Sequence, residues 1–293
     1  MDLPDILSCS DVKQRIREAL AEDLGPKKLD ATSFALMPGK EKATAHLIAR
    51  TDCVLAGGPV AAEVFRQVDK SLQIVQPKVD GSKLESGDIA LTVSGSARSI
   101  LVAERTALNF IQRMSGVATM TRRYVDAANH SGVAILDTRK TTPTLRRFEK
   151  YAVACGGGAN HRFGLYDRVM IKDNHLAYWT ASGGDLPGAV RAVREKYPDL
   201  LIEVEVDTLE QLKTLLPVKP DWVLLDNMTP LQLRECVKLC AGVCKTEASG
   251  GVTLETVREI AKTGVDAISV GALTHSAPSV DLALDFAQKI STR

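Results

Sequence analysis

The chain has 293 residues, which is enough for two domains of ordinary size or for one large barrel. Its 37 Lys and Arg residues nearly balance its 36 Asp and Glu residues, so the formal net charge is only +1. With 45% hydrophobic and 25% charged residues, the composition is that of a folded globular protein. These values exclude a wholly disordered chain, and they argue against a nucleic-acid binder that depends on a strongly basic body.

The sequence carries none of the usual signals for export or for a membrane span. No apolar run approaches the roughly 18 to 20 residues that cross a bilayer, and residues 1–14 contain no apolar signal-peptide core. We therefore expect a cytoplasmic protein whose cysteines are free thiols. These are Cys9, Cys53, Cys155, Cys236, Cys240 and Cys244. The last three recur every four residues, which on one helix would align them in a stripe, but the helix is expected to end near Gly242 and to leave Cys244 on the following strand. The three are therefore interpreted as small buried side chains, with a metal site as the less favoured alternative.

The first part of the chain predicts a helix, a strand-rich unit and a second helix. Residues 10–24 have the periodicity of an amphipathic helix, with Ser10 as its N-cap and Gly25-Pro26 as its stop. Residues 42–95 contain short apolar or alternating runs that turn signals separate, which indicates a compact strand-rich unit. Residues 98–128 return to helical periodicity.

From about residue 133 the chain alternates between apolar strands and helices. The six strand candidates are residues 133–137, 168–172, 201–206, 222–226, 243–248 and 267–271. The helical stretches between them are residues 186–197, 208–216, 230–240 and 253–263. This alternation predicts a parallel sheet covered by helices. A closed barrel usually has eight such units, so the pattern leaves a doubly wound sheet and an incomplete barrel open.

Each of the six strand candidates delivers polar or glycine residues at its carboxyl end, where parallel α/β folds bind their ligands. The candidate site residues at these ends are Thr138, Arg139, Lys140, Lys172, Glu205, Asp226, Ser249, Gly250, Gly251, Ser269 and Gly271, together with Val270 between the last two. His161 and Arg162 follow a run of three glycines that leads into another loop. Together the cations on a near-neutral protein predict an anion site, because arginine forms bidentate pairs with carboxylates and phosphates.

The strand ends that contain glycine and the strand ends that contain a carboxylate predict different kinds of binding site. The turn at residues 249–251 precedes a helix expected to begin near Thr253, so its backbone N–H groups could bind phosphate, or it could simply be a tight turn. Glu205 and Asp226 could hold Mg²⁺ or stabilise positive charge on a sugar carbon. They could also pair with the neighbouring cations.

Seven segments of the chain resemble the quinolinate phosphoribosyltransferase family. They are AERTALNFIQRMSG (103–116), DTRKTTP (137–143), CGGGANHRFGLYDRVMIKDNH (155–175), EVEVD (203–207), LLDN (224–227), EASGGV (247–252) and ISVGALTHSAP (268–278). The resemblance implies transfer of a phosphoribosyl group from phosphoribosyl pyrophosphate (PRPP) to quinolinate with decarboxylation. The products would be nicotinate mononucleotide, pyrophosphate and CO₂, with Mg²⁺ as cofactor, in de novo NAD biosynthesis.

The resemblance also implies an architecture and an assembly. An N-terminal α/β sandwich domain would span residues 1–115 and an open, incomplete parallel β/α barrel residues 116–278, with a C-terminal helix at about 279–293 packing on the first domain. The chain would form a homodimer, or a higher oligomer, whose active site is shared between subunits. Neither nucleic acid nor a membrane is an expected partner.

Residue roles follow from the same resemblance. Arg139, His161, Arg162 and Lys172 match positions that hold quinolinate, and Arg105 matches an arginine that enters from the other subunit. Thr138 and Lys140 match the same pocket, with Lys140 also near PRPP. Glu205 and Asp226 match the acids near the ribose and Mg²⁺, and residues 249–251 and 269–271 match phosphate-binding turns. The expected catalytic residues are Lys140, Lys172, Glu205 and Asp226.

Three rival functions remain open. A relative with the same fold could act on another heterocyclic acid. A Schiff-base aldolase could use Lys172 as its nucleophile. A carrier module is suggested by the glycine-turn rhythm of residues 79–95, but this segment has no lysine at the tip of a tight turn and is interpreted as scaffold.

Overall fold

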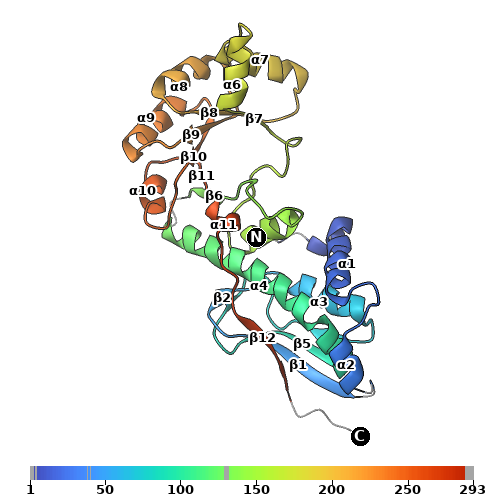
Figure 1. The fold of residues 1–293 in the computed structure, drawn as a ribbon. Coiled ribbons are helices and arrows are strands. Elements are labelled where there is room, and N and C mark those ends of the chain that lie inside the picture. The colour runs from blue at the N-terminus through green and yellow to red at the C-terminus, as the bar shows by residue number, and fades with distance from the viewer. Residues whose placement is uncertain (1–2, 4, 38, 40, 129–131, 288–293) are drawn as a thin grey trace. The chain divides into compact units, whose positions relative to one another are not determined.

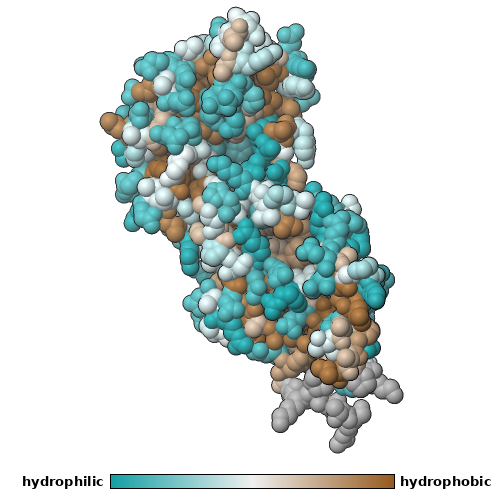
Figure 2. Space-filling model, viewed as in Figure 1, coloured by the Kyte–Doolittle hydropathy of each residue, from teal (hydrophilic) through white to brown (hydrophobic). Residues whose placement is uncertain are grey.

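A computed structural model describes residues 3, 5–37, 39, 41–128 and 132–287 of the chain. The chain folds into two compact units. The first comprises residues 1–122, 142–157 and 276–293, and the second comprises residues 123–141 and 158–275. Hydrophilic side chains cover much of the face shown in Figure 2, with hydrophobic ones scattered between them.

A four-stranded antiparallel sheet organises the first unit (Figure 1), and its strand order is β12-β1-β5-β3. A separate pair, β2 and β4, completes its strands. The strands are β1 (Lys42–Ala49), β2 (Cys53–Val54), β3 (Gln73–Val75), β4 (Lys83–Leu84), β5 (Ile89–Ser96) and β12 (Leu282–Phe286). In β1 the alternate residues Ala45, Leu47 and Ala49 are fully buried, which is the period of a strand with one face on the core.

Of the helices in the first unit, those predicted at residues 10–24 and 98–128 are confirmed. The sequence does not predict the others, and Gly58–Val68 lies inside the segment predicted to be strand-rich. The helices of this unit are η1 (Ile6–Ser8), α1 (Ser10–Leu24), α2 (Ala31–Leu36), α3 (Gly58–Val68), α4 (Ala97–Ala127), whose last residues belong to the second unit, and α5 (Arg146–Cys155). The predicted helix over 10–24 is confirmed, and Val12, Ile16 and Leu20 form its buried stripe. Its predicted cap is wrong, because Ser10 is already helical and Cys9 occupies the N-cap position.

The predicted C-terminal helix over 279–293 is wrong for the residues that the structure describes. Leu282–Phe286 forms strand β12 instead, and it pairs antiparallel with β1 so that Leu284 lies opposite Leu47. This pairing satisfies backbone N–H and C=O groups along the edge of β1, which a helix would leave open. Residues 288–293 of the predicted helix lie outside the described part of the chain.

The second unit is built on a six-stranded parallel sheet with the order β6-β11-β10-β9-β8-β7. Its strands are β6 (Ala134–Leu136), β7 (Val169–Ile171), β8 (Ile202–Val206), β9 (Trp222–Asp226), β10 (Lys245–Ser249) and β11 (Ala267–Ser269). In the described residues β6 and β7 are the two edges of the sheet. The six strands agree with the pattern of apolar runs, and the open sheet agrees with the incomplete barrel that the family resemblance implies.

Helices follow the strands of this sheet along the chain (Figure 1). They are α6 (Asp173–Ala181), α7 (Leu186–Lys196), α8 (Leu209–Leu215), η2 (Leu216–Val218), α9 (Pro230–Cys240), α10 (Val257–Ala261) and α11 (Ala272–His275). Thr208 and Thr229 cap α8 and α9 through capping boxes. One face of the central strands is apolar, because Val204, Val223 and Leu225 are fully buried there, whereas the opposite face carries the buried Glu203 and Glu247.

All six cysteines are free, as predicted. Cys236 and Cys240 are buried on α9, and Cys244 precedes β10. In the described residues these three thiols do not form a metal-ligand group; Cys236 and Cys240 are buried side chains as predicted, whereas Cys244 is only partly buried. No helix of the described chain is long and apolar enough to cross a bilayer.

Candidate active site

One cavity of the second unit, with a volume of about 850 Å³, gathers the polar ends of its parallel strands. It is lined by Thr138, Arg139, Lys140, His161, Arg162, Lys172, Glu205, Asp226, Ser249, Gly250, Gly251, Ser269, Val270 and Gly271. Parallel strands point their carboxyl ends to the same edge, so residues that are far apart in the chain meet there. The barrel residues singled out from the sequence therefore line a single cavity.

The cavity also contains residues that the sequence did not single out. They are Met170, Leu224, Asn227, Glu247, Val252, Thr253, Ala272 and His275. Most are neighbours of the predicted residues, and Asn227 follows Asp226 directly. Glu247 lies two residues before Ser249, so the period of two along β10 is the signal that could have identified it.

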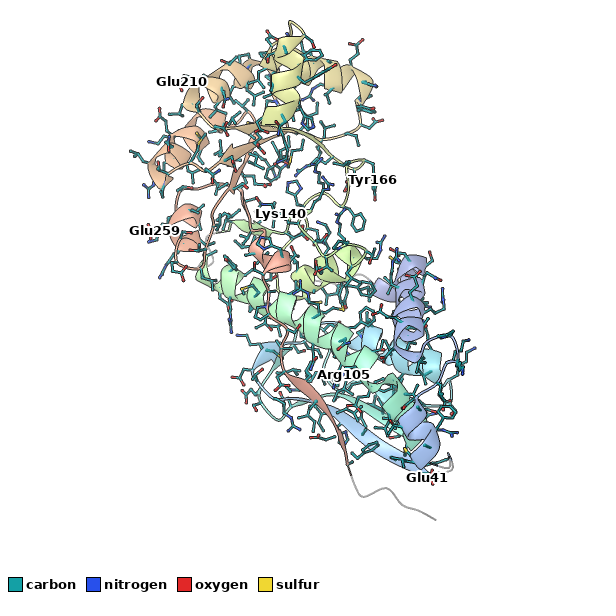
Figure 3. The ribbon with its side chains drawn as sticks, viewed as in Figure 1. Glu41, Arg105, Lys140, Tyr166, Glu210 and Glu259 are labelled. Atoms are coloured by element: carbon teal, nitrogen blue, oxygen red, sulfur yellow. The ribbon has the colours of Figure 1, made fainter. Side chains whose placement is uncertain are left out.

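Arg105 lies on α4 in the first unit, where its side chain is exposed, and Figure 3 labels it together with Lys140 in the loop after β6. The 850 Å³ cavity is lined by residues of the second unit only. The role expected of Arg105 in a neighbouring subunit's site therefore stays a prediction.

Two guanidinium groups dominate the cationic side of the cavity. Burial, and then the nearby charge of Arg139, lower the pKa of Arg162. The Arg162 guanidinium is held from behind, since it donates to the carbonyl oxygen of Arg168 at 3.2 Å. An anion bound between the two arginines would relieve their mutual repulsion and desolvation, so this side of the cavity suits a carboxylate-bearing ligand.

The acidic side of the cavity is formed by the ends of β8 and β9. Lys172 Nζ lies 2.8 Å from Glu205 Oε2, and the Glu205 side chain is only 12% exposed. Burial, and then the charges of Glu205 and Asp207, raise the pKa of Asp226. The clustered carboxylates therefore repel one another, and a cation or a developing positive charge between them would be stabilised.

Two small-residue turns close the cavity on a third side. Gly250 and Gly251 have positive φ angles of 93° and 58°, which other residues rarely adopt. At Gly271 an added Cβ would lie 3.0 Å from His275 Nε2, so only glycine fits there without a shift. The tight-turn interpretation of these glycines is therefore correct, and since both turns line the cavity, their backbone can also face a ligand.

The helix expected near Thr253 begins later, at Val257, and has five residues. Residues 253–256 form a turn instead, because the Thr253 N–H donates to Thr256 Oγ1 and the Thr256 N–H donates to the Thr253 carbonyl oxygen. Phosphate binding at residues 249–251 would consequently depend on backbone N–H groups of the turn rather than on a helix N-terminus.

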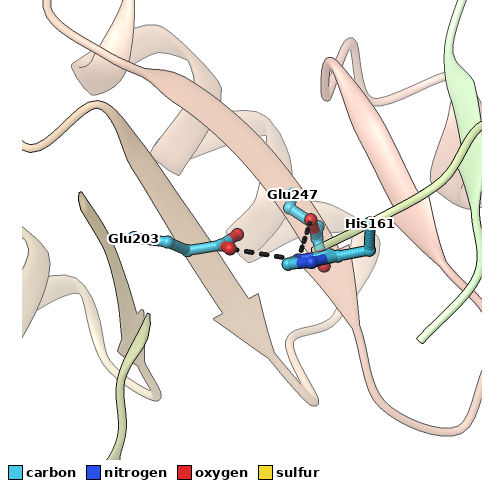
Figure 4. A group of neighbouring side chains, drawn as sticks. All are labelled: His161, Glu203 and Glu247. Carbon is cyan, nitrogen blue, oxygen red and sulfur yellow. Dashed lines mark ion pairs between the residues drawn. The ribbon is translucent and has the colours of Figure 1, made fainter. Parts of the chain in front are cut away.

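His161 sits between two buried carboxylates (Figure 4). Its Nε2 lies 3.0 Å from Glu203 Oε2 and 3.3 Å from Glu247 Oε2, and both glutamates are fully buried. Arg168 reaches the same oxygen of Glu203 at 3.3 Å. A protonated His161 and Arg168 can therefore balance the two buried carboxylates.

The charge of His161 depends on both ring nitrogens. Burial of the ring opposes protonation, but the contacts with Glu203 and Glu247 outweigh it and raise the pKa of His161 to about 9. At the other nitrogen, Nδ1 accepts the backbone N–H of Arg162 at 2.6 Å. That second contact requires a lone pair, so charging the ring breaks it and frees the Arg162 N–H.

Comparisons with known proteins agree with this arrangement. A family model described as "Quinolinate phosphoribosyl transferase, N-terminal domain" matches residues 30–115, and the corresponding "C-terminal domain" matches residues 117–285. A protein of Bacillus subtilis named probable nicotinate-nucleotide pyrophosphorylase (carboxylating) is 41% identical over 274 residues, which cover 94% of this chain and 93% of that protein.

Two further similarities cover almost the whole chain. A Mycobacterium leprae protein named nicotinate-nucleotide pyrophosphorylase (carboxylating) is 44% identical over 278 residues, covering 93% of this chain and 96% of its own. The solved structure of the nicotinate-nucleotide pyrophosphorylase from Francisella tularensis superposes with a TM-score of 0.89 at 38% identity, covering 97% of this chain and all of that one. Matching domain models and these identities place the chain in the quinolinate phosphoribosyltransferase family.

Proposed function

We propose that this chain transfers the phosphoribosyl group of PRPP to quinolinate and decarboxylates the product, giving nicotinate mononucleotide, pyrophosphate and CO₂. The observation that carries the proposal is a cavity in which neighbouring arginines, an acidic pair and two glycine turns meet. The names of the similar proteins, which specify a carboxylating nicotinate-nucleotide pyrophosphorylase, support it. The reaction would supply de novo NAD biosynthesis.

The cationic side suits a dicarboxylate better than a monocarboxylate. Quinolinate has two adjacent carboxylates, and Arg139, Arg162 and Lys172 offer several positive groups around one cavity. A monocarboxylate such as nicotinate would leave part of this charge unpaired in a partly buried site, which costs binding energy. Thr138 and His161 line the same cavity and complete the proposed pyridine pocket.

The acidic side suits the sugar. In the proposed reaction the quinolinate ring nitrogen attacks the anomeric carbon of PRPP while pyrophosphate departs, so positive charge develops on the sugar. Glu205 and Asp226 are placed to stabilise that charge, and Lys140 and Lys172 supply positive charge for the departing pyrophosphate. The carboxylate next to the ring nitrogen then leaves as CO₂, because the positively charged nitrogen stabilises the electron pair left on the ring carbon, and a proton from water replaces the carboxylate there.

The chain's own residues fit a Mg²⁺ ion. Carboxylates are preferred Mg²⁺ ligands, and the charges of Glu205 and Asp207 already raise the pKa of Asp226. We propose that Glu205 and Asp226 would hold the ion. When bound, the ion would neutralise charge on the pyrophosphate group. The 5-phosphate would face the turns at residues 249–251 and 269–271, whose backbone lines the cavity.

The assembly and the compartment are proposals of the same kind. We propose a homodimer in which Arg105 of one subunit enters the site of the other, supported by its exposure on α4 and by the family resemblance of residues 103–116. A cytoplasmic location is supported by six free cysteines, which suit a reducing compartment. Size-exclusion chromatography with light scattering and cell fractionation test the two statements.

The decisive experiment is PRPP-dependent release of CO₂ from quinolinate labelled at its 2-carboxylate. We expect release with PRPP and Mg²⁺, loss of release on chelation, and no nucleotide formation from nicotinate at matched concentrations. Turnover of nicotinate in preference to quinolinate would favour the rival with another heterocyclic acid.

The aldolase alternative meets an obstacle in the structure. A Schiff-base lysine needs its amine free to attack a carbonyl, whereas Lys172 Nζ is held in an ion pair with Glu205 Oε2 at 2.8 Å. Borohydride treatment with a carbonyl substrate is expected to trap no adduct on Lys172, and a trapped adduct would support the aldolase. Residues 79–95 supply β4 and most of β5 of the first unit, in agreement with their interpretation as scaffold.

A further inference from the structure

Asn227 has an uncommon backbone for a residue with a side chain. It follows strand β9 with a φ of 53°, in the left-handed region that disfavours most L-residues and that asparagine tolerates best. Such conformations persist where neighbouring contacts hold them, and they concentrate at functional sites. Asn227 lines the cavity, so its neighbours there explain the conformation.

The polar groups of Asn227 connect two sides of the cavity. Its side-chain Nδ2 donates to Asp226 Oδ2 at 2.7 Å, and its backbone N–H donates to the carbonyl oxygen of Ser249 at 2.9 Å. A carboxylate can only accept, so the amide nitrogen faces Asp226 and the amide oxygen faces the other way. Asn227 thus contacts both Asp226 at the end of β9 and the turn after β10.

Gly250 makes room for this arrangement. A Cβ added there would overlap the Oδ1 and Cγ atoms of Asn227 and would lie 2.9 Å from its backbone nitrogen. Gly250 also has a φ of 93°. The absence of a side chain at this glycine therefore serves a specific close contact as well as the turn itself.

We propose that Asn227 is a positioning residue for PRPP: its side-chain amide holds the carboxylate of Asp226, its backbone N–H holds the Ser249 carbonyl oxygen, and together they set the spacing between the acid and the Ser249–Gly251 turn. PRPP has a reacting sugar carbon next to one of these groups and a phosphate next to the other, under the function proposed above. A change in this spacing should consequently affect PRPP more than quinolinate, which the arginines hold.

The first test compares two glycine variants. N227G keeps the left-handed backbone accessible but removes the amide, and K219G is its matched control, because Lys219 also has a positive φ (47°) and does not line the cavity. We expect N227G to raise the KM for PRPP about tenfold, the typical effect of losing a hydrogen bond to a charged group. The KM for quinolinate should stay within about twofold, and K219G should change neither.

The second test uses the close contact at Gly250. G250A alone should raise the KM for PRPP, because the new methyl group displaces the Asn227 amide. In N227G/G250A the overlapping amide is gone, so the two effects should be clearly less than additive. G264A is the control for backbone strain, since Gly264 has a φ of 90° and its added Cβ would lie 3.6 Å from the nearest atom, Val237 Cγ1.

The outcomes separate this proposal from the proposed function. Wild-type protein that releases no CO₂ from quinolinate and PRPP overturns the function. Active wild type with an unchanged PRPP KM in N227G, or with both KM values raised alike, overturns the positioning role. If N227G does not fold, N227D replaces the donor with a carboxylate facing Asp226, and an unchanged PRPP KM in N227D also overturns it. Protection of the protein against thermal unfolding by PRPP gives the same comparison without turnover.

Discussion

Arg162 shows how one side chain combines binding with the cost of burial. Its guanidinium is partly buried, donates a hydrogen bond to the Arg168 carbonyl oxygen, and has a pKa lowered by burial and by Arg139. Burial and the nearby charge of Arg139 disfavour the charged guanidinium, and a bound carboxylate would offset both. The sequence identified the residue type, whereas only the structure shows that a second arginine acts on it.

Replacing Arg162 by alanine should weaken quinolinate binding selectively. We expect R162A to raise the quinolinate KM by roughly 10- to 150-fold, corresponding to about 1.5–3 kcal/mol for a lost charged hydrogen bond. R139A should act in the same direction. R191A is the control, because Arg191 is exposed on α7 and pairs with Asp185 only at 3.8 Å. Near-normal quinolinate KM values in both site variants would contradict the assignment.

His161 should make the stability of the protein depend on pH in a defined direction. Its pKa is raised from 6.5 to about 9 in the folded protein, so the folded state binds more protons between these values. This contribution is fully present below pH 6.5 and is lost as the pH rises through about 9. The raised pKa of Glu203, caused first by burial, acts with the same sign.

The variant E247Q tests this pH dependence, because it replaces one of the two carboxylates beside His161 by an uncharged amide. We expect the melting temperature of wild type to fall from pH 6.5 to 9.5 and that of E247Q to fall less over this range. The difference should be on the order of 1.4 kcal/mol for each unit by which the His161 pKa drops. Nuclear magnetic resonance of the His161 ring gives that pKa directly, and an unchanged value in E247Q would refute the explanation.

At the scale of elements, β12 shows a pairing that periodicity alone does not reveal. Residues 282–286 alternate Leu, Ala, Leu, Asp and Phe, which suits a strand, but a short run near a chain end also suits a helix. The strand is favoured because the edge of β1 has backbone N–H and C=O groups that pair with these residues, which lie more than 200 positions away in sequence. The pairing joins the end of the chain to the first unit.

Proline at position 283 should break this pairing. Hydrogen bonds from Ala287 to Thr44 and from Arg50 to Asp281 mark the bonded pairs of the ladder, and alternation places the Ala283 N–H toward β1. We expect A283P to destabilise the first unit by about 1–3 kcal/mol, because a donor is lost and an acceptor stays unpaired. A283V, which suits a strand, should have a melting temperature close to wild type. Equal melting temperatures for the two variants would show that β12 contributes little.

At the scale of the whole molecule, the first unit and the cavity-bearing unit have separate tasks in the proposed mechanism. The cavity supplies the arginines, acids and turns, while Arg105 lies on α4 of the first unit. In a symmetric dimer each subunit would supply Arg105 to its partner. A site shared between subunits predicts that mixtures of two inactive variants recover activity, whereas a site contained within one subunit does not.

Mixed dimers of two inactive variants should recover activity. R105A lacks the entering arginine but keeps an intact cavity, and R162A has the reverse defect. Random mixing makes half of the dimers mixed, each with one complete site, so we expect about a quarter of wild-type activity. R105A mixed with R105A protein bearing a different tag is the control and should recover nothing. Mixed dimers that form but stay inactive would argue against the shared site.

The sequence by itself determined the features that follow from the local order of apolar and polar residues. Apolar runs at regular spacing predicted the six parallel strands, and the polar residues after them predicted which side chains meet in the cavity, because parallel strands share one carboxyl edge. The tertiary structure decided what depends on distant segments. In the tertiary structure Leu282–Phe286 is a strand, the helix predicted to begin near Thr253 begins at Val257, and His161 lies between Glu203 and Glu247. These features depend on contacts between residues far apart in the chain or on competing turn hydrogen bonds, and periodicity reports only a residue's neighbours along its own element.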